Sequence, residues 1–129
     1  EVFKKCMEFA RKNMKHGQNA VDVQKGIEDI VKDHGYICGH LSGHGIGMDV
    51  IERPFVALPG KTSFIGVESP SDNDKDIEIL KENMVISLHP QIIRSDLKKS
   101  VYMSDVFVIK KDGAVSLSDK SYETIVIDK

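Results

Sequence analysis

The feature of this sequence that most constrains its fold is a change in hydrophobic pattern near Gly35. Before Gly35, apolar residues recur at intervals of three and four, as on one face of an α-helix. Later in the chain they gather in short runs rich in β-branched residues, which favour strands. Helices followed by several strands are typical of the α+β class. We therefore predict two helices packed on one face of a curved antiparallel sheet.

The two helical patterns have recognisable ends. Gly17 stops the first pattern, and Asn19 is a good N-cap for the second, which Gly35 ends. Asp22 lies in the first turn of the second helix, where the helix dipole favours an acid. The predicted buried stripes are Val2, Phe3, Cys6, Met7, Ala10 and Met14 in the first helix, and Ala20, Val23, Ile27, Ile30 and Val31 in the second.

Four later segments are predicted to be strands. They cover residues 83–93, 101–109, 114–118 and 124–127. The sequence KKDG at 110–113 is typical of a turn and predicts a hairpin between the second and third of them.

Length and composition limit the classes of function. With 129 residues the chain is one domain or part of one, and a net charge of −2 does not favour nucleic acid or acidic lipid. No apolar run approaches the roughly 20 residues that span a bilayer, and no signal peptide is recognisable. Two cysteines, Cys6 and Cys38, favour a reduced setting, so we expect a cytoplasmic protein. Because Glu1 already lies within a helical pattern, we expect a longer natural chain to precede it.

The polar segment after Pro59 contains DNDKDIE, which invites comparison with a calcium loop. A loop beginning at Asp72 needs Gly at position 77 and Glu at position 83, and the chain has Ile77 and Asn83 there. A solvated acidic loop is the better interpretation.

Residues 39–55, GHLSGHGIGMDVIERPF, hold two histidines four residues apart among four glycines. Each glycine opposes a helix by about 1 kcal/mol relative to Ala, so the spacing does not pair the rings as on a zinc-binding helix. Leu41 also stands where such a motif has its glutamate. GHGIG lacks the Lys–Ser/Thr ending of a phosphate loop. From the residues alone, a structural role for the glycines and one histidine stays open beside a functional role.

The segment SGHGIGMDVIERP resembles the GHGIG…HE-x-P signature of the pita-bread superfamily, which includes methionine aminopeptidase, aminopeptidase P, prolidase and creatinase. Three other segments resemble family elements in the same order. They are NAVDVQKGIEDIVKDHGY (the preceding helix), LKENMVISLHPQI (the L-x-x-GMV-x-x-x-EP strand) and SDVFVIKKDGAVSLS (the EDTVLVTEDG hairpin). The resemblance implies that residues 1–129 are the C-terminal half of a creatinase/aminopeptidase-like catalytic domain, one half of a pita-bread fold, without its N-terminal half.

Active peptidases of this superfamily hold two metal ions with two Asp, one His and two Glu, and keep a second His near the substrate. The resemblance implies that His44 is the metal-binding histidine, and Ile51 stands in place of the second histidine. His89 replaces the Glu of the EP pair. Ser104 replaces the Glu of the ED pair, while Asp105 keeps the second acid. Because carboxylates neutralise and bridge two metal ions, we expect a degenerate site without standard two-metal activity.

Three hypotheses remain for a pocket in which we expect His44, His89 and Ser104 to converge. In the first, a metal-free hydrolase cleaves a C–N bond, with His44 or His89 carrying the proton. In the second, the two histidines and an acid from outside this chain hold one divalent ion. In the third, the domain is catalytically inactive and binds a peptide or protein. A Ser104–His dyad is disfavoured because no nucleophile-elbow pattern surrounds Ser104.

We therefore predict a fragment of a hydrolase of the Xaa-Pro dipeptidase or creatinase kind. Its substrate is a small molecule or short peptide, with no nucleic-acid or membrane partner. No cofactor is expected, and one divalent ion on the two histidines is the alternative. We expect the full-length chain to form a homodimer, and the isolated chain to be inactive with an exposed apolar edge. The candidate catalytic residues are His44 and His89, and the candidate pocket residues are Ser104, Asp105, His40 and Ile51.

Overall fold

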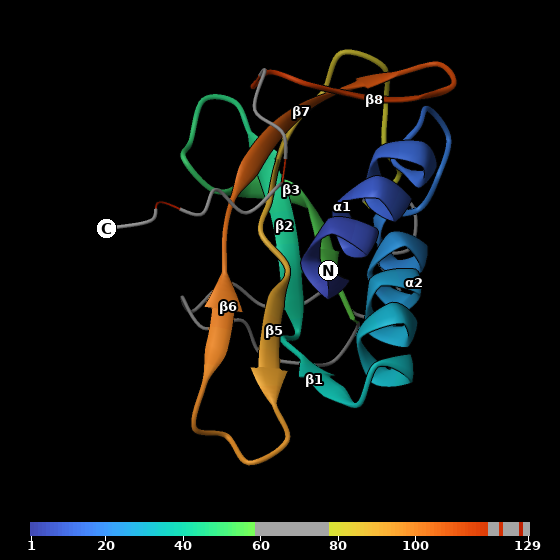
Figure 1. The fold of residues 1–129 in the computed structure, drawn as a ribbon. Coiled ribbons are helices and arrows are strands. Elements are labelled where there is room, and N and C mark those ends of the chain that lie inside the picture. The colour runs from blue at the N-terminus through green and yellow to red at the C-terminus, as the bar shows by residue number, and fades with distance from the viewer. Residues whose placement is uncertain (59–77, 119–121, 123–126, 128–129) are drawn as a thin grey trace.

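The computed structural model describes residues 1–58, 78–118, 122 and 127 (Figure 1). Two helices come first and strands follow, which confirms the α+β class. The elements are α1 (Val2–Asn13), α2 (Ala20–Asp33), β1 (Tyr36–Cys38), β2 (Leu41–Ile46), β3 (Glu52–Ala57), β4 (Val85–Leu88), β5 (Gln91–Arg94), β6 (Ser100–Tyr102), β7 (Asp105–Lys110) and β8 (Gly113–Ser116).

The described strands form two antiparallel sheets rather than one. A five-stranded sheet has the order β3-β2-β4-β7-β8, and a three-stranded sheet has the order β1-β5-β6. The strand expected at 83–93 divides at His89–Pro90, and the strand expected at 101–109 divides at Met103–Ser104. Proline has no backbone donor for a sheet ladder, which explains the first break. The chain thus crosses between the two sheets at both points.

Helix α2 begins and ends as its sequence predicts, whereas α1 ends at Asn13, before the predicted stop at Gly17. The side chain of Asn19 accepts a hydrogen bond from the backbone N–H of Val21 at 2.8 Å, which confirms it as the N-cap of α2. Gly35 follows α2 with a φ of +76°, a left-handed conformation that glycine adopts without strain.

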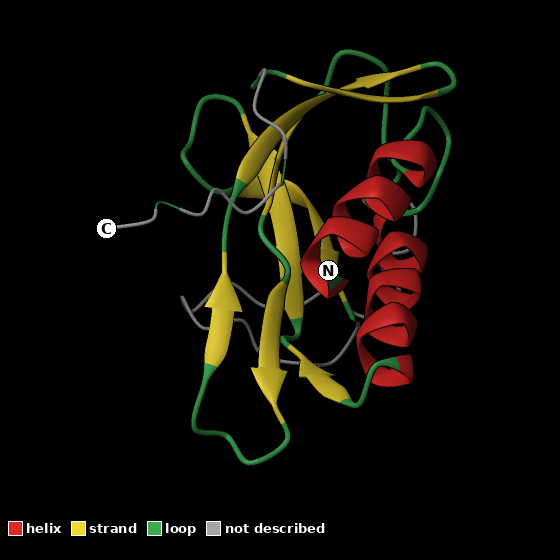
Figure 2. Cartoon of the chain, viewed as in Figure 1, coloured by secondary structure: helices red, strands yellow, loops and turns green. Residues whose placement is uncertain are grey.

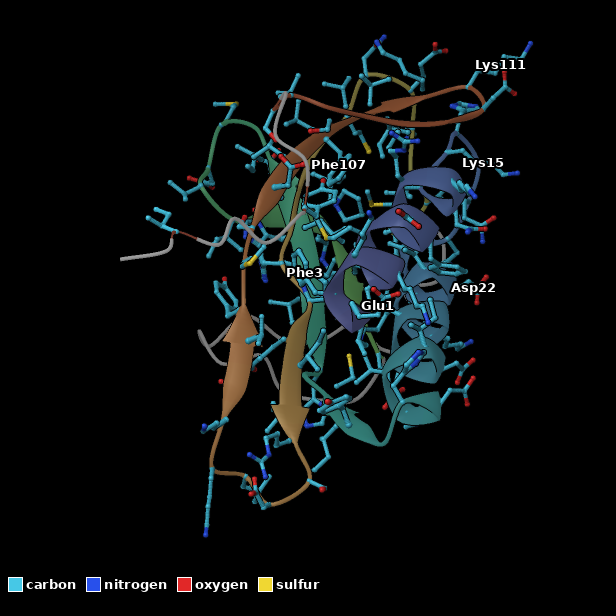
Figure 3. The ribbon with its side chains drawn as sticks, in the orientation of Figure 1. Glu1, Phe3, Lys15, Asp22, Phe107 and Lys111 are labelled. Atoms are coloured by element: carbon cyan, nitrogen blue, oxygen red, sulfur yellow. The ribbon has the colours of Figure 1, made fainter. Side chains whose placement is uncertain are left out.

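The core lies between the helix pair and the five-stranded sheet. Figure 2 shows α1 and α2 side by side against one side of the strands, and Figure 3 shows Phe3 and Phe107 between α1 and the sheet. Cys6, Met7 and Ala10 of α1 and Ile27 and Val31 of α2 are fully buried there, as the periodicity predicts. No helix in the described ranges is long and apolar enough to cross a membrane.

The glycine-rich segment 39–55 contributes two neighbouring strands, β2 and most of β3. The predicted turn at 110–113 is confirmed, because Lys110 and Gly113 pair across the β7–β8 hairpin. Residues 124–126 of the strand expected at 124–127 and the calcium-like residues 72–77 lie outside the described residues.

Candidate functional site

The five-stranded sheet has two different faces. Gly43 of β2 lies opposite Leu88 of β4, which belongs to the helix-covered core. The next residue, His44, lies opposite Ser87. Because successive side chains in a strand alternate between faces, His44 and Ser87 point away from the helices. We call this the histidine face, defined by His44, Ser87 and Val106 of β7, and the other the helix face.

Two glycines allow His44 to occupy this position. A Cβ atom on Gly43 would lie 2.6 Å from the backbone oxygen of Ser87, and one on Gly45 would lie 2.6 Å from the backbone oxygen of Arg53. Real Cβ atoms do not approach backbone oxygens that closely. The flanking glycines therefore let β2 pack between β3 and β4 with the imidazole in the middle of the sheet.

The ring of His44 is held in one tautomer. Its Nδ1 lies 3.0 Å from the backbone oxygen of Gly45. A carbonyl oxygen only accepts, so Nδ1 donates, and in the neutral ring the lone pair is on Nε2. His44 is 8% exposed, so this lone pair is presented from a largely buried ring.

His89 lies directly after β4 and faces His44. The two ring centroids are 5.1 Å apart with an interplanar angle of 53°. The backbone N–H of His89 donates to the carbonyl of Ser42 at 2.7 Å, which fixes the residue at the end of the strand. Burial, reinforced by the nearby charge of His44, lowers the pKa of His89, so the ring is neutral near pH 7. Its Nδ1 is buried without a hydrogen-bond partner among the described residues.

Ser104 joins the same neighbourhood through Ser87. The two hydroxyl oxygens are 3.2 Å apart, and Ser87 lies opposite His44 in the sheet register. Ser104 itself is exposed, at the point where the chain enters β7. His44, His89 and Ser104 are therefore brought to one side of the sheet.

Asp105 does not join them, which corrects the expectation that it lines the same pocket. It lies opposite Leu88, on the helix face. Its Oδ2 accepts hydrogen bonds from Ser116 at 2.8 Å and from the hydroxyl of Tyr122, whose ring contacts Phe3 of α1. The physical reason is strand alternation. Asp105 directly precedes Val106, which lies on the histidine face, so the side chain of Asp105 points to the opposite face.

His40 and Ile51 lie at the ends of the β2–β3 unit. The side chain of His40 is exposed just before β2, and its carbonyl accepts from the backbone of Leu58 at 3.4 Å. Ile51 is half-buried just before β3. Neither takes part in the ring contacts that join His44 and His89.

Two further groups border the histidines, and Arg53 of the neighbouring strand β3 forms an ion pair; none of these was identified from the sequence. Ser87 stands two residues before His89, so strand alternation could have placed it on the same face. Tyr102 packs its ring on His89 with centroids 5.3 Å apart. Arg53 pairs with the fully buried Glu78, which also accepts from the backbone N–H of Phe55. These contacts join residues 13 to 25 positions apart in the sequence, and no local pattern signals them.

The described residues do not fit a two-metal centre. No group of three or more His, Cys, Asp or Glu side chains is arranged to hold a metal ion in the described part of the chain. The carboxylate of Glu78 is engaged by Arg53, and that of Asp105 lies on the helix face. The two imidazoles lack the bridging carboxylates that such a centre requires.

A family model, Metallopeptidase family M24, matches residues 1–111. An uncharacterized peptidase of Methanocaldococcus jannaschii is 30% identical over 109 residues, which are 84% of this chain and 28% of that protein. An Xaa-Pro dipeptidase of Pyrococcus furiosus is 28% identical over 127 residues, which are 97% of this chain and 30% of that protein. The chain thus spans less than a third of the length of either relative.

Solved structures agree on the architecture. A dipeptidase from Pyrococcus horikoshii OT3 superposes with a TM-score of 0.72 at 27% identity, covering 98% of this chain and 31% of that one. An Xaa-Pro dipeptidase from Bacillus anthracis superposes with a TM-score of 0.73 at 19% identity, over 98% of this chain and 31% of that one. Both similarities support the pita-bread arrangement of two helices on antiparallel strands.

Proposed function

Because the chain belongs to the metallopeptidase family M24, we propose that it is the C-terminal half of the catalytic domain of an Xaa-Pro-dipeptidase-like hydrolase. In this proposal, a segment outside these 129 residues forms the opposite wall of the active site. The short span of the chain relative to its relatives supports the division. The observation that carries the function is the His44–His89 pair, two buried imidazoles 5.1 Å apart on the histidine face.

The reaction is hydrolysis of a C–N bond in a short peptide or small molecule. His44 accepts a proton on Nε2 from the attacking water, and the new C–O bond forms as hydroxide adds to the carbonyl carbon. The resulting imidazolium returns the proton to the leaving nitrogen as the C–N bond breaks, giving an acid and an amine. His89 stays neutral and donates a ring N–H to the carbonyl oxygen, which carries the developing negative charge.

This mechanism needs no resident metal ion. We propose it because the carboxylates that would hold metal ions are missing from the described part of the histidine face. Ser104 and His89 stand at the positions where the family resemblance implies glutamates. A site built on uncharged groups holds a neutral amide more readily than a pair of dications. The proposed setting is the cytoplasm, and the proposed assembly is a homodimer of the full-length chain.

A second candidate is a catalytically silent domain that binds a peptide or protein. Tyr102, whose ring packs on His89, is 59% exposed, and its chain neighbours Val101 and Met103 are 48% and 46% exposed. Exposed apolar groups at the rim of a former active site favour binding. This candidate differs from the first only in lacking turnover.

The test is hydrolysis of a panel of Xaa-Pro dipeptides and small amides by the full-length protein, with and without a chelator. We expect turnover that survives the chelator and falls by about 10²-fold or more in His44→Ala and His89→Ala. His34→Ala is the matched control, because among the described residues its exposed ring hydrogen-bonds Lys5 and the backbone of α2, away from the histidine face.

Three outcomes decide between the candidates. Chelator-sensitive turnover contradicts the metal-free mechanism. Turnover unchanged in both histidine variants contradicts the site assignment. Binding of peptides without turnover, lost in the same variants, establishes the binding domain instead.

A further inference from the structure

Three rings stand in a row on the histidine side of the molecule. His44 and His89 are 5.1 Å apart, and His89 and Tyr102 are 5.3 Å apart with an interplanar angle of 36°. The exposure changes sharply along this row. His44 and His89 are 8% and 7% exposed, whereas Tyr102 is 59% exposed. Tyr102 is therefore the ring of the row that remains broadly accessible to a ligand.

The fold explains why Tyr102 meets His89. Leu88 of β4 pairs with Asp105 of β7 in the large sheet, and Gln91 of β5 pairs with Tyr102 of β6 in the small sheet. The chain crosses between the sheets at residues 89–90 and again at residues 103–104. These crossings lie side by side, and the pairing of Tyr102 with Gln91 of β5 holds the end of β6 next to His89.

The surroundings of Tyr102 select the kind of ligand group that it can bind. Its neighbours Val101 and Met103 are exposed and apolar, and His89 behind it is a flat ring. An exposed tyrosine ring face favours stacking with another flat or cyclic apolar group, because such a group loses little hydration and gains contact area. A glycine residue in the ligand has no side chain and offers no such contact area to the ring of Tyr102.

We propose that Tyr102 determines specificity: its ring, backed by His89, forms a subsite for a flat or cyclic apolar group of the ligand next to the bond presented to the histidines. The inference deepens the proposed hydrolase and rests on its placement of the ligand at His44 and His89. Tyr102 lies at the edge of the small sheet and its ring is largely exposed. A ring with a purely structural role would be covered by other side chains.

The test measures binding of two probes that cannot be hydrolysed. They are the reduced-amide analogues of Gly-Phe and Gly-Gly, in which the peptide carbonyl is replaced by CH₂, and their Kd values are measured on the full-length protein by calorimetry. We expect the Gly-Phe analogue to bind more tightly. In Tyr102→Ala this preference falls about three- to tenfold, and in Tyr102→Phe, which keeps the ring, it is retained.

Tyr36→Ala is the matched control. Tyr36 is also exposed, at 38%, and lies in the same small sheet, but it pairs with Arg94 at the far end of β5. Its removal should leave the preference unchanged. An equal loss in Tyr36→Ala and Tyr102→Ala, or no preference in the unaltered protein, overturns the subsite.

A second measurement does not depend on a truncated side chain. The sequence contains no tryptophan, so Tyr102→Trp introduces a single fluorophore at the subsite. The Gly-Phe analogue should change its emission at concentrations where the Gly-Gly analogue does not, and identical responses contradict the proposal. Since neither measurement needs turnover, a stacking subsite without hydrolysis would refute the proposed function while leaving this inference standing.

Discussion

The two faces of the five-stranded sheet are built on different principles. The helix face is a packed apolar layer, with Phe107, Ile86 and Leu88 fully buried against α1 and α2. The histidine face carries His44, Ser87 and half-buried Val106, and its neighbouring rings are His89 and Tyr102. The comparison teaches that alternate residues of the same strands supply apolar packing on one face and the side chains of the proposed site on the other.

The sharpest test of this division is a pair of neighbouring substitutions in β7. Phe107→Ala should lower the free energy of unfolding by about 3–5 kcal/mol, because it leaves a cavity in the core. Val106→Ala, one residue away on the histidine face, should cost about 1 kcal/mol or less. Urea unfolding of both variants measures the difference, and equal losses would break the comparison.

The next effect concerns the strand that carries His44. Gly45→Ala places a methyl group 2.6 Å from the backbone oxygen of Arg53, so β3 must shift, at a cost of about 1–3 kcal/mol. The NMR signals of His44 should move as well. Gly17→Ala is the control, because Gly17 has a φ of +82° but nothing within 4 Å of its Cβ position. It should lower stability through backbone strain while leaving the His44 signals in place.

A smaller effect is expected at the one acid on the helix face of β7. Burial alone would raise the pKa of Asp105, but hydrogen bonds from Tyr122, Ser116 and the backbone of Val106 outweigh it and hold the pKa below its usual value. The ionised form therefore stabilises the fold above the unfolded pKa of about 3.9. That contribution is lost as the pH falls through the lower, folded-state pKa.

Asp105→Asn should accordingly cost about 1–2 kcal/mol at pH 7, and progressively less as the pH falls below about 4. Thermal unfolding from pH 7 to pH 2 measures this. Asp112→Asn, in the exposed β7–β8 turn, serves as the control and should leave stability unchanged. A pH-independent loss in Asp105→Asn would show that the carboxylate charge is irrelevant.

The smallest effect is expected between Ser87 and Ser104. Their hydroxyls are 3.2 Å apart on the histidine side, so a double-mutant cycle with alanine should give a coupling of about 0.5–1 kcal/mol. A coupling indistinguishable from zero would mean that Ser104 is not held against the sheet.

The helix face was largely predictable from the sequence. Three- and four-residue spacing identified both helices and their buried stripes, and Asn19 and Gly35 marked the ends of α2. These signals are local, since a helix repeats its contacts every turn. The division of two expected strands was missed because sheet pairing depends on residues far away in the chain.

The histidine face was predictable only in part. Resemblance to a family motif brought out His44, His89 and Ser104, which the sheet register brings to one side. Asp105 was misplaced because it lies opposite Leu88 in the sheet register, which turns its side chain to the helix face. Tyr102 and Arg53 were missed because their partners, His89 and Glu78, lie 13 and 25 positions away.

The measurement that tests the central claim most directly is the metal content of the full-length protein, purified without chelator, by elemental mass spectrometry. The account predicts no transition metal at a stoichiometric level, because the histidine face lacks the carboxylates of a two-metal centre. One ion per chain, lost in His44→Ala or His89→Ala, would contradict the metal-free mechanism. Two ions per chain would contradict the assignment of His89 and Ser104 as replacements for metal ligands.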